Sequence, residues 1–341
     1  MYLSVIIPTR NRGKELCIAL GSLAKQTLSP DEFEVIVVDN GSTDNTRDVV
    51  SSYQGEIKNL RCFYDNAPGL HVGRNRGLKE AMADILVYAD DDIEAFPVWL
   101  EGIKESFALD KNIGLVGGKN LPAFETEPPE WLLKMWNMNT KVGKILGYLS
   151  LIDLGEEIKE INPSFVFGCN FAIKKQVLIE AGGFHPDGMP QKLIKYRGDG
   201  ESYISSCILE KGYMTLYNPK ASVYHFVPEK RMTLEYFCIR AFNEGISSSY
   251  VQIRKNHIKT PVKKRNINNE SIITIAKTVK GKLLFIINLI NVKLNKFKKD
   301  IFYEIHNEIN KAYKAGYRYH QNEVKNDPKL LEWVLLENYL G

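Results

Sequence analysis

Three adjacent aspartates, Asp90, Asp91 and Asp92, directly follow the hydrophobic segment 85–89. Carboxylates so close together repel one another, and a divalent cation relieves that repulsion. Mg²⁺ and Mn²⁺ accept carboxylate oxygens and leave coordination positions open for substrate phosphates. In an extended segment, residues i and i+2 point to the same side, so Asp90 and Asp92 can share a face while Asp91 points elsewhere. The run predicts a site for Mn²⁺ or Mg²⁺, with a solvated acidic turn as the alternative.

Polar residues also follow two earlier hydrophobic segments. Residues 8–11 (PTRN) come after the first segment, and residues 39–46 (DNGSTDNT) come after the second. Because Ser and Asn are typical caps of helix N-termini, capping is the simpler explanation for Ser42 and Asn45. Asp39 directly follows a strand-like segment, where its carboxylate can accept hydrogen bonds from a nucleobase or a ribose. We interpret Asp39 as part of a nucleotide site.

A glycine-rich segment, residues 69–77 (GLHVGRNRG), leads into a helical pattern and carries two arginines. Backbone amides at a helix N-terminus attract anions, and guanidinium groups bind phosphates through paired hydrogen bonds. The segment predicts a diphosphate site at Gly69 and Arg74. Taken alone, it is also compatible with an ordinary loop that carries solvated arginines.

The hydrophobic pattern supplies a scaffold for these segments in the first third of the chain. Short β-branched runs alternate with helical patterns, which predicts a mainly parallel sheet covered by helices on both faces. Ligands of such sheets bind beyond the carboxyl ends of the strands, so the polar segments should meet at one edge. The predicted strands are residues 3–7, 34–38, 60–64, 85–89 and 113–116, and the predicted helices are residues 14–25, 45–53, 72–82 and 97–107.

The pattern is looser between residues 121 and 163, where Pro and Trp occur. After about residue 260 the chain is rich in lysine and helical by composition, so we expect a domain boundary there. The elements predicted between these regions are strands at 164–168, 214–217 and 222–226 and helices at 176–181 and 201–211.

The succession SVIIPTRNR, VIVVDNGSTDNT, GLHVGRNRG and VYADDDI resembles the inverting glycosyltransferases of family 2, of the bacterial surface-polysaccharide type. The match in order and spacing covers about residues 1–125. The resemblance implies an α/β GT-A fold, Rossmann-like, with a mainly parallel central sheet flanked by helices. It also implies a GT-A domain over residues 1–258, with a nucleotide-sugar half (1–125) and an acceptor half (126–258), followed by a basic helical extension (259–341).

The same resemblance implies a reaction and its partners. A sugar would pass, with inversion, from a nucleotide-diphosphate donor, a UDP-sugar by preference, to a glycan or a lipid-linked glycan. Arg10 and Asn40 depart from the family pattern next to the nucleobase, which leaves the identity of the base open. The residues implied to bind the donor are Pro8, Thr9, Arg10, Asn11, Asp39, Gly69, Arg74, Asn75, Asp90 and Asp91.

The resemblance also assigns the metal ligands. In the family's DxD motif the later carboxylate usually binds the metal and the earlier ones approach the ribose, which points to Asp92 first and Asp90 second. Enzymes of this fold often place a histidine at the end of a later strand to hold the metal or the diphosphate, and here that residue is His225. A structural histidine is the alternative.

Inverting transfer needs a general base that deprotonates the acceptor hydroxyl. Counting back from Gly212 places Glu201 at the family's base position, whereas matching the leading glycine selects Asp199; we favour Glu201. Both acids also stabilise the first turn of the predicted helix. Asn170 matches an acceptor-side position, with an ordinary strand-edge asparagine as the alternative.

Composition agrees with an intracellular enzyme. The five cysteines show no CxxC pairing, which fits a reducing compartment, and the modest net charge of +4 gives no reason to expect a nucleic-acid partner. The N-terminus lacks the pattern of a secretory signal. The longest apolar run, residues 283–292, is about half of the roughly 20 residues that a membrane-spanning helix needs. We therefore expect a cytoplasmic protein, if membrane-associated then peripheral on the inner face.

Residues 272–309 combine leucine and isoleucine with many lysines. A basic amphipathic helix of this kind either lies on an anionic membrane surface or packs its apolar side on the catalytic domain or a second subunit. We favour packing or dimerisation, and membrane contact stays open.

Two other functions fit part of the pattern. A noncatalytic nucleotide-sugar-binding protein would keep the fold without turnover, but the acidic run and the acids at 199 and 201 argue against it. A nucleotidyltransferase would normally show a phosphate loop rich in glycine and lysine after the first strand, and PTRNRGKE imitates that loop only in part. A dehydrogenase is disfavoured because no GxGxxG follows the first strand.

Overall fold

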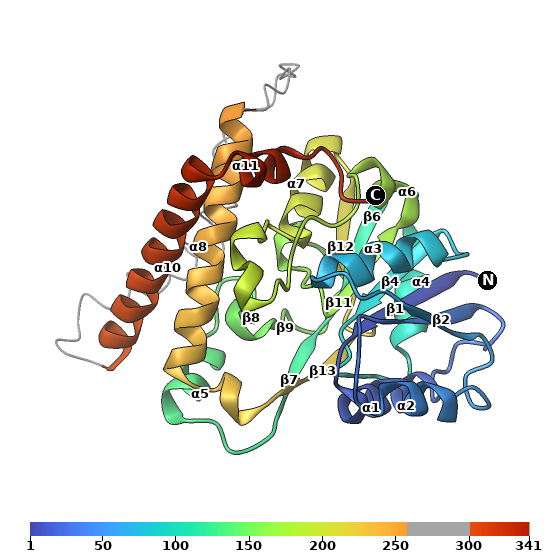
Figure 1. Ribbon diagram of the computed structural model, residues 1–341. Coiled ribbons are helices and arrows are strands. Elements are labelled where there is room, and N and C mark those ends of the chain that lie inside the picture. Colours follow the sequence, from blue (N-terminus) through green and yellow to red (C-terminus); the bar gives the residue numbers. More distant parts are fainter. Residues whose placement is uncertain (258–300, 341) are drawn as a thin grey trace.

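The structure is a computed structural model that describes residues 1–257 and 301–340. Its described part contains an eight-stranded central sheet, a five-stranded second sheet and an arm of long helices beside them (Figure 1). The central sheet has the order β10-β12-β6-β11-β4-β1-β2-β3. Its strands are β1 (Leu3–Thr9), β2 (Phe33–Asp39), β3 (Leu60–Tyr64), β4 (Ile85–Ala89), β6 (Ile113–Gly117), β10 (Lys159–Glu160), β11 (Asn170–Lys174) and β12 (Met214–Tyr217).

The central sheet is mixed. Strands β4, β1, β2 and β3 run parallel, as the alternation of strands and helices predicts. Strand β11 is antiparallel to both of its neighbours, β4 and β6. The carboxyl ends of β1, β2 and β4 still share one edge, and the polar segments 8–11, 39–46 and 90–92 follow there.

Apolar side chains cover the sheet on both faces. In β1, Val5 and Ile7 belong to one core cluster and Ile6 to the other, because side chains alternate along a strand. The first face is covered by α1 (Gly13–Leu23), α2 (Thr46–Ser52) and α4 (Trp99–Leu109). The second face is covered by α3 (Leu70–Glu80), α6 (Lys175–Glu180) and α7 (Glu201–Lys211).

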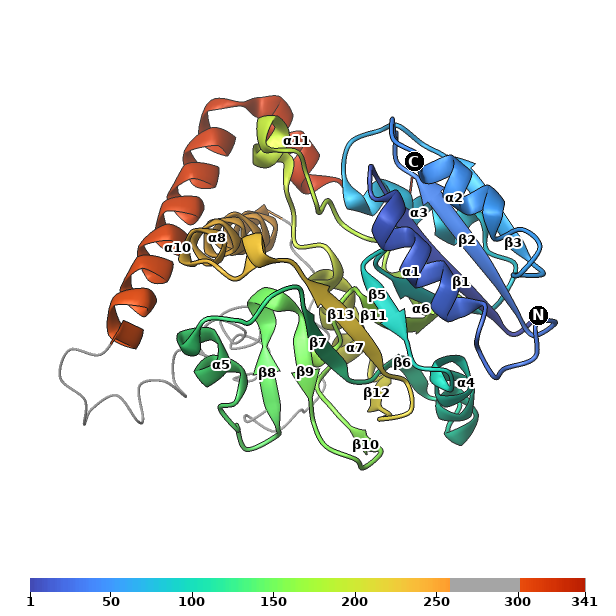
Figure 2. The ribbon, with the colours of Figure 1, turned by 90° about the horizontal axis from the view of Figure 1, so that it is seen from below.

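The loosely patterned region 121–163 contributes most of the second sheet (Figure 2). The sheet has the order β5-β13-β7-β9-β8. Its strands are β5 (Ile93–Ala95), β7 (Asn120–Phe124), β8 (Lys144–Leu146), β9 (Leu151–Asp153) and β13 (Val223–Val227), and the short helices α5 (Glu130–Trp136) and η1 (Gly147–Leu149) lie beside it. Strand β13 pairs with β5 so that His225 lies opposite Ile93, the residue that follows the aspartate run.

The predicted strand at residues 164–168 is wrong. Those residues belong partly to a 3₁₀ turn, η2 (Pro163–Phe165), which Asn162 caps by accepting a hydrogen bond from Ser164 N over 2.9 Å. Proline has a fixed φ and no N–H group, which suits a turn better than a central strand. The strand β11 begins later, at Asn170.

The helical arm consists of α8 (Leu234–His257) and α10 (Ile301–Asn326), which lie side by side (Figure 1), and of α11 (Pro328–Leu335). Glycines let α8 and α10 approach closely, since a Cβ atom on Gly245 or Gly316 would overlap the backbone of the other helix. After α11 the chain returns to the central domain, where Tyr339 O accepts a hydrogen bond from Asn75 Nδ2 over 3.1 Å.

None of the helices in residues 1–257 and 301–340 is long and apolar enough to cross a membrane. Of the predicted amphipathic stretch, residues 272–300 lie outside the described residues. Residues 301–309 form the start of α10, where Ile305 and Ile309 pack into a core cluster with α5 and α8.

Candidate active site

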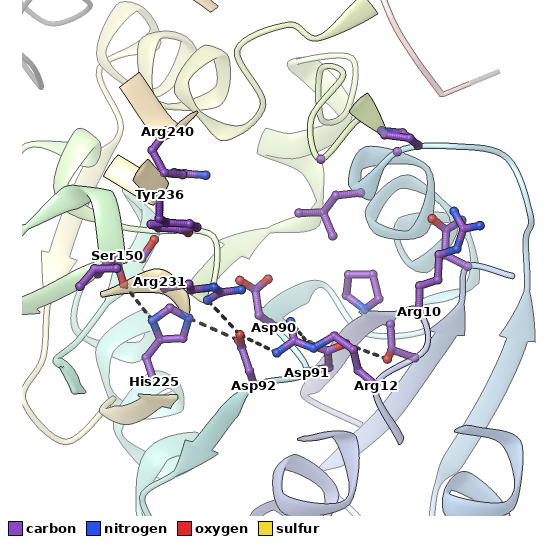
Figure 3. A pocket seen from close by; sticks show the side chains of 18 of the residues that line it. Arg10, Arg12, Asp90, Asp91, Asp92, Ser150, His225, Arg231, Tyr236 and Arg240 are labelled. Carbon is purple, nitrogen blue, oxygen red and sulfur yellow. Dashed lines mark hydrogen bonds and ion pairs between the residues drawn. The ribbon is translucent and has the colours of Figure 1, made fainter. Parts of the chain in front are cut away.

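A pocket of about 350 Å³ lies beyond the carboxyl ends of β1 and β4 (Figure 3). The η1 turn and the start of α8 close it from the opposite side. The residues of the predicted site that line it are Pro8, Thr9, Arg10, Gly69, Asp90, Asp91, Asp92 and His225. Segments far apart in the sequence therefore meet where the parallel strands end.

Asp91 is turned toward the first strand and helix. Its Oδ2 accepts a hydrogen bond from Thr9 Oγ1 over 2.7 Å, and its Oδ1 lies 3.2 Å from Arg12 Nη1. Burial raises the pKa of Asp91 to about 7, against the opposing effect of Arg12. Asp91 thus connects the aspartate run to the loop that follows β1.

Asp92 is surrounded by nitrogen atoms. Arg12 Nη2 lies 3.0 Å and Arg231 Nη1 3.2 Å from its Oδ2, and His225 Nε2 lies 3.3 Å from its Oδ1. Burial alone would raise the pKa of Asp92, but His225, Arg231 and Arg12 outweigh burial and hold the pKa well below its ordinary value. Asp92 is therefore ionised at neutral pH.

His225 presents one free ring nitrogen to the pocket. Its Nδ1 donates to Leu149 O over 2.9 Å, so in the neutral ring Nε2 carries a lone pair. This nitrogen lies 3.3 Å from Asp92 Oδ1, a buried oxygen that has no hydrogen-bond partner in the described part of the chain. A protonated ring pairs with this oxygen and lowers the pKa of Asp92, whereas the neutral ring leaves both atoms without a proton. Two adjacent lone pairs without a proton between them are a suitable pair of ligands for a cation.

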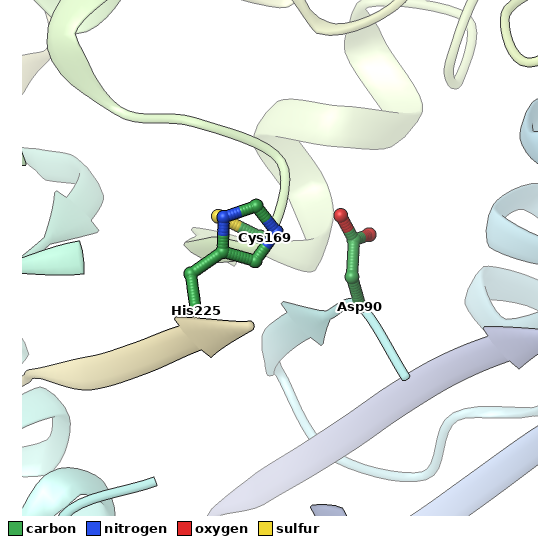
Figure 4. Close-up of side chains that lie close together, drawn as sticks. All are labelled: Asp90, Cys169 and His225. Atoms are coloured by element: carbon green, nitrogen blue, oxygen red, sulfur yellow. The ribbon is translucent and has the colours of Figure 1, made fainter. Parts of the chain in front are cut away.

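Asp90 completes this group. A carboxylate oxygen of Asp90, a ring nitrogen of His225 and Cys169 Sγ all lie within 4.8 Å of one another (Figure 4). Burial raises the pKa of Cys169 well above its ordinary value, so its sulfur stays a thiol. Carboxylate and imidazole ligands suit Mn²⁺, and the residues present fit the predicted metal.

Arg74 does not line the pocket but lies behind it, almost completely buried. Its guanidinium contacts Asp90 Oδ1 over 3.2 Å and Glu201 Oε2 over 3.6 Å, and it lies 5.1 Å above the ring of Phe184. Gly168 leaves the space for this group, because a Cβ there would overlap Arg74 Nη2. Arg74 thus joins the aspartate run to the start of α7.

The two candidate bases have different surroundings. Glu201 is the first residue of α7, and its side chain is 19% exposed beside Arg74. Asp199 is 8% exposed and lies 2.7 Å from Nδ1 of His185, whose ring stacks on Tyr203. Neither carboxylate lines the pocket itself, but Glu201 is connected to it through Arg74.

Gly200, between the two acids, leaves no room for a side chain. Its φ of 52° belongs to the left-handed region that favours glycine. A Cβ at this position would lie 2.9 Å from Asp187 Oδ2. The space for a side chain at position 200 is therefore taken by Asp187, whose Oδ1 pairs with Arg197 Nη1 over 2.6 Å.

Two predicted donor-binding residues hold the neighbouring loop. Asn11 has a φ of 52°, and its Oδ1 accepts a hydrogen bond from Thr43 N over 2.7 Å. Asp39 Oδ1 accepts from Ser42 N over 2.7 Å, and its Oδ2 lies 3.4 Å from Arg47 Nε. Neither residue lines the pocket, which the loop 40–46 reaches through Asn40.

Asn75 and Asn170 are buried and fully engaged within the protein. Asn75 bonds both backbone groups of Phe184 in addition to Tyr339 O. Asn170 Oδ1 accepts from Trp99 Nε1 over 3.0 Å, and its Nδ2 donates to Ala221 O over 2.9 Å. Their amide groups hold the structure around the pocket in this state, and the predicted contact of each asparagine with a substrate stays a prediction.

Several pocket residues were absent from the sequence prediction. They are Arg12, Tyr148, Ser150, Arg231, Tyr236 and Arg240. The spacing of Tyr236 and Arg240 by four residues places both on one side of a helix, and this signal was available. That α8 folds back over the carboxyl ends of β1 and β4 was not, because the helix lies over 140 residues beyond the aspartate run.

The described part of the chain has a solved structural counterpart in the mannosyltransferase PcManGT from Pyrobaculum calidifontis, solved in complex with GDP-Man and Mn²⁺. The likeness covers 98% of this chain and 86% of that one, with a TM-score of 0.55 at 17% sequence identity. At this identity the comparison establishes the fold, which is the GT-A fold that the sequence predicts.

The family model described as "Glycosyl transferase family 2" matches residues 4–182. The chain belongs to glycosyl transferase family 2, and the resemblance in its motifs is confirmed. A validoxylamine A glucosyltransferase from Streptomyces hygroscopicus subsp. limoneus is 42% identical over 108 residues, which are 31% of this chain and 24% of that protein. A glucosyl-dolichyl phosphate glucuronosyltransferase from Haloferax volcanii is 26% identical over 258 residues, 74% of this chain and 78% of that protein. The chain thus spans about a quarter of the first relative and most of the second.

Proposed function

We propose that this protein is an inverting glycosyltransferase that depends on a divalent metal. It transfers a sugar from a nucleotide-diphosphate donor, a UDP-sugar by preference, to a hydroxyl group of a glycan or lipid-linked glycan. The observation that carries the proposal is that Asp92 Oδ1, which lacks a hydrogen-bond partner in the described chain, lies 3.3 Å from His225 Nε2, so that the two atoms can bind one cation. Family membership supports the reaction class.

Asp92, His225 and Asp90 would hold Mn²⁺ or Mg²⁺, and the bound ion would neutralise charge on the leaving diphosphate. Leu149 O fixes the His225 ring so that Nε2 faces the pocket. Arg12 and Arg231 keep Asp92 ionised and oriented. The chain's own residues therefore prepare the site before substrate arrives.

The donor's nucleotide would occupy the opposite end of the pocket, beside Pro8, Thr9, Arg10 and Gly69. Asn40 shapes this end, since its Nδ2 donates to Asp65 O over 2.6 Å and to Ala67 O over 2.9 Å and so fixes the loop before Gly69. The carboxylate of Asp39, which precedes this loop, would accept hydrogen bonds from the base or the ribose.

Glu201 would act as the general base. It begins α7 beside the pocket, and Arg74 contacts both its carboxylate and that of Asp90. A general base must accept the proton of the attacking hydroxyl, and the side chain of Glu201 is more accessible for this than that of Asp199. Asp199 would orient His185 and the loop that precedes α7.

The acceptor would bind between α7, α8 and the second sheet. The chain would divide into a GT-A domain (1–258) and a helical extension (259–341). The extension would pack on the domain or on a second subunit in preference to a membrane. A cytoplasmic location fits a donor of this type. The glucosyl-dolichyl phosphate named for the second relative supports a lipid-linked acceptor.

A donor panel tests the proposal. UDP- and GDP-sugars are incubated with the protein in Mn²⁺ and in chelator, and nucleoside diphosphate release is measured. We expect release with one donor class, only with metal. Binding without turnover would instead indicate a noncatalytic nucleotide-sugar-binding protein, and release of pyrophosphate would indicate a nucleotidyltransferase.

A further inference from the structure

One end of the pocket carries hydrogen-bond donors without partners. Arg240 Nε and the hydroxyl of Tyr148 are shielded from solvent, and neither makes a hydrogen bond within the described residues. Both residues line the pocket. A buried polar group without a partner costs about 1–3 kcal/mol, and a charged group more. A ligand that accepts hydrogen bonds at this end would remove that cost.

Two further donors lie beside them. Tyr236 is one helical turn before Arg240 on α8, and Ser150 follows η1 with a φ of 55°, an unusual backbone conformation for a residue other than glycine. Strained backbone of this kind clusters at binding sites. Figure 3 shows Tyr236 and Arg240 together at the end of the pocket away from Arg10.

The charge of Arg240 is not matched as those of its neighbours are. Arg12 and Arg231 both form ion pairs with Asp92, whereas Arg240 has no ion pair within residues 1–257 and 301–340. Arg10 also lacks one there, but its side chain is exposed to water. A guanidinium that lines a pocket and forms no ion pair of its own is suited to an anionic ligand.

Arg231 and Arg240 have different surroundings. Arg231 contacts the metal-side carboxylate Asp92 over 3.2 Å. Burial lowers the pKa of Arg240, but Tyr236, Glu244, Asp187 and Glu201 together outweigh burial and raise it. These three carboxylates lie near enough to Arg240 for their charge to act on it, although none of them forms an ion pair with it within the described residues.

We propose that Arg240, Tyr148 and Tyr236 form a subsite for an anionic group of the acceptor, a phosphate or a carboxylate. The inference rests on the proposed function, because Glu201 marks the acceptor end. It narrows the acceptor to acidic glycans, in which a phosphate or a uronic acid stands near the attacking hydroxyl. The donor's diphosphate is the other source of the same chemistry, and the experiment separates the two.

Inorganic phosphate is titrated into the full chain holding Mg²⁺ and saturating UDP, and binding is measured by calorimetry. UDP occupies the diphosphate position, so phosphate that still binds reports a second anion site. We expect phosphate to bind the wild type, and Arg240→Gln to weaken that binding by about tenfold or more. Tyr148→Phe, which removes only the hydroxyl, should weaken it about threefold. Arg10→Gln, which removes the same charge from the other end, is the matched control and should change it less than about twofold.

Three results would overturn the subsite. They are the absence of phosphate binding beside UDP, equal phosphate affinity of Arg240→Gln and wild type, and a loss of UDP affinity in Arg240→Gln, which would assign the anion to the donor. If thermal unfolding shows that Arg240→Gln does not fold, the phosphate affinity of Tyr148→Phe is the test, and an affinity equal to that of the wild type would overturn the subsite. Failure of the proposed function has a separate signature, namely that neither UDP nor GDP binds with metal. The dependence of phosphate binding on Arg240 is then measured without nucleotide.

Discussion

Glu201→Gln removes the proposed base while keeping the shape of the side chain. A positioned general base contributes about 10²–10⁴ in rate, or about 3–5 kcal/mol of the barrier. The buried Arg74 keeps a partner in the folded state, because Asp90 Oδ1 stays 3.2 Å away and the amide oxygen of Gln can still accept from the guanidinium; we therefore expect a loss of about 1–3 kcal/mol of folding free energy. We therefore expect kcat to fall by about 10²–10⁴ with nearly unchanged donor affinity.

Asp199→Asn is the matched control, since it also replaces one carboxylate by an amide at the start of α7. Its carboxylate is buried against His185, so the expected loss is about 1–3 kcal/mol of folding free energy, with a smaller effect on kcat. Stopped assays of nucleotide release give kcat, and calorimetry with the donor gives affinity. Wild-type turnover by Glu201→Gln, together with an inactive but folded Asp199→Asn, would refute the assignment.

Three further predictions concern the metal, pH and packing. His225→Ala should weaken Mn²⁺ binding in calorimetry by at least about tenfold, and unchanged affinity would exclude His225 as a ligand. Burial lowers the pKa of His320 to about 4, so the unfolded chain binds the proton more tightly and the free energy of unfolding should fall as pH drops from about 6.5 to 4, by up to about 3 kcal/mol. In urea titrations, the free energy of unfolding of His320→Gln should lack this contribution to the pH dependence. Parallel pH curves for the variant and the wild type would contradict the prediction. Gly77→Ala should lose about 1–3 kcal/mol of stability in the same titrations, because its Cβ would overlap Ile6 in the core; a neutral result would show that the helix can shift.

Local patterns predicted the central sheet well because its strands are buried and β-branched. The predicted bounds of β3, β4, α7 and β12 agree with the structure. The second sheet was missed because β8 and β9 have only three residues each, too few for a period to show. Residues 164–168 read as a strand because hydrophobicity does not distinguish a strand from a 3₁₀ turn held by Asn162 and Pro163.

The candidate site also has a part that the sequence predicts and a part that it does not. Asp90 to Asp92 follow a strand, and strand ends are readable in the sequence. The position of Arg240 depends on how α8 crosses the domain, which no local pattern encodes. Arg74 was predicted to bind phosphate, and the structure shows it buried between Asp90 and Glu201; a pattern identifies the arginine but not its partners.

The return of the chain after α11 determines the order in which the site is completed during synthesis. Tyr339 hydrogen-bonds Tyr250 over 2.8 Å, and its ring packs against His185, the partner of Asp199. At about 5–20 residues per second, the ribosome makes the strands of the nucleotide end many seconds before Tyr339. A newly made chain can therefore fold the half that we propose to bind the donor while the loop before α7 still lacks its final support. We expect a nascent chain to bind nucleotide before it can transfer sugar.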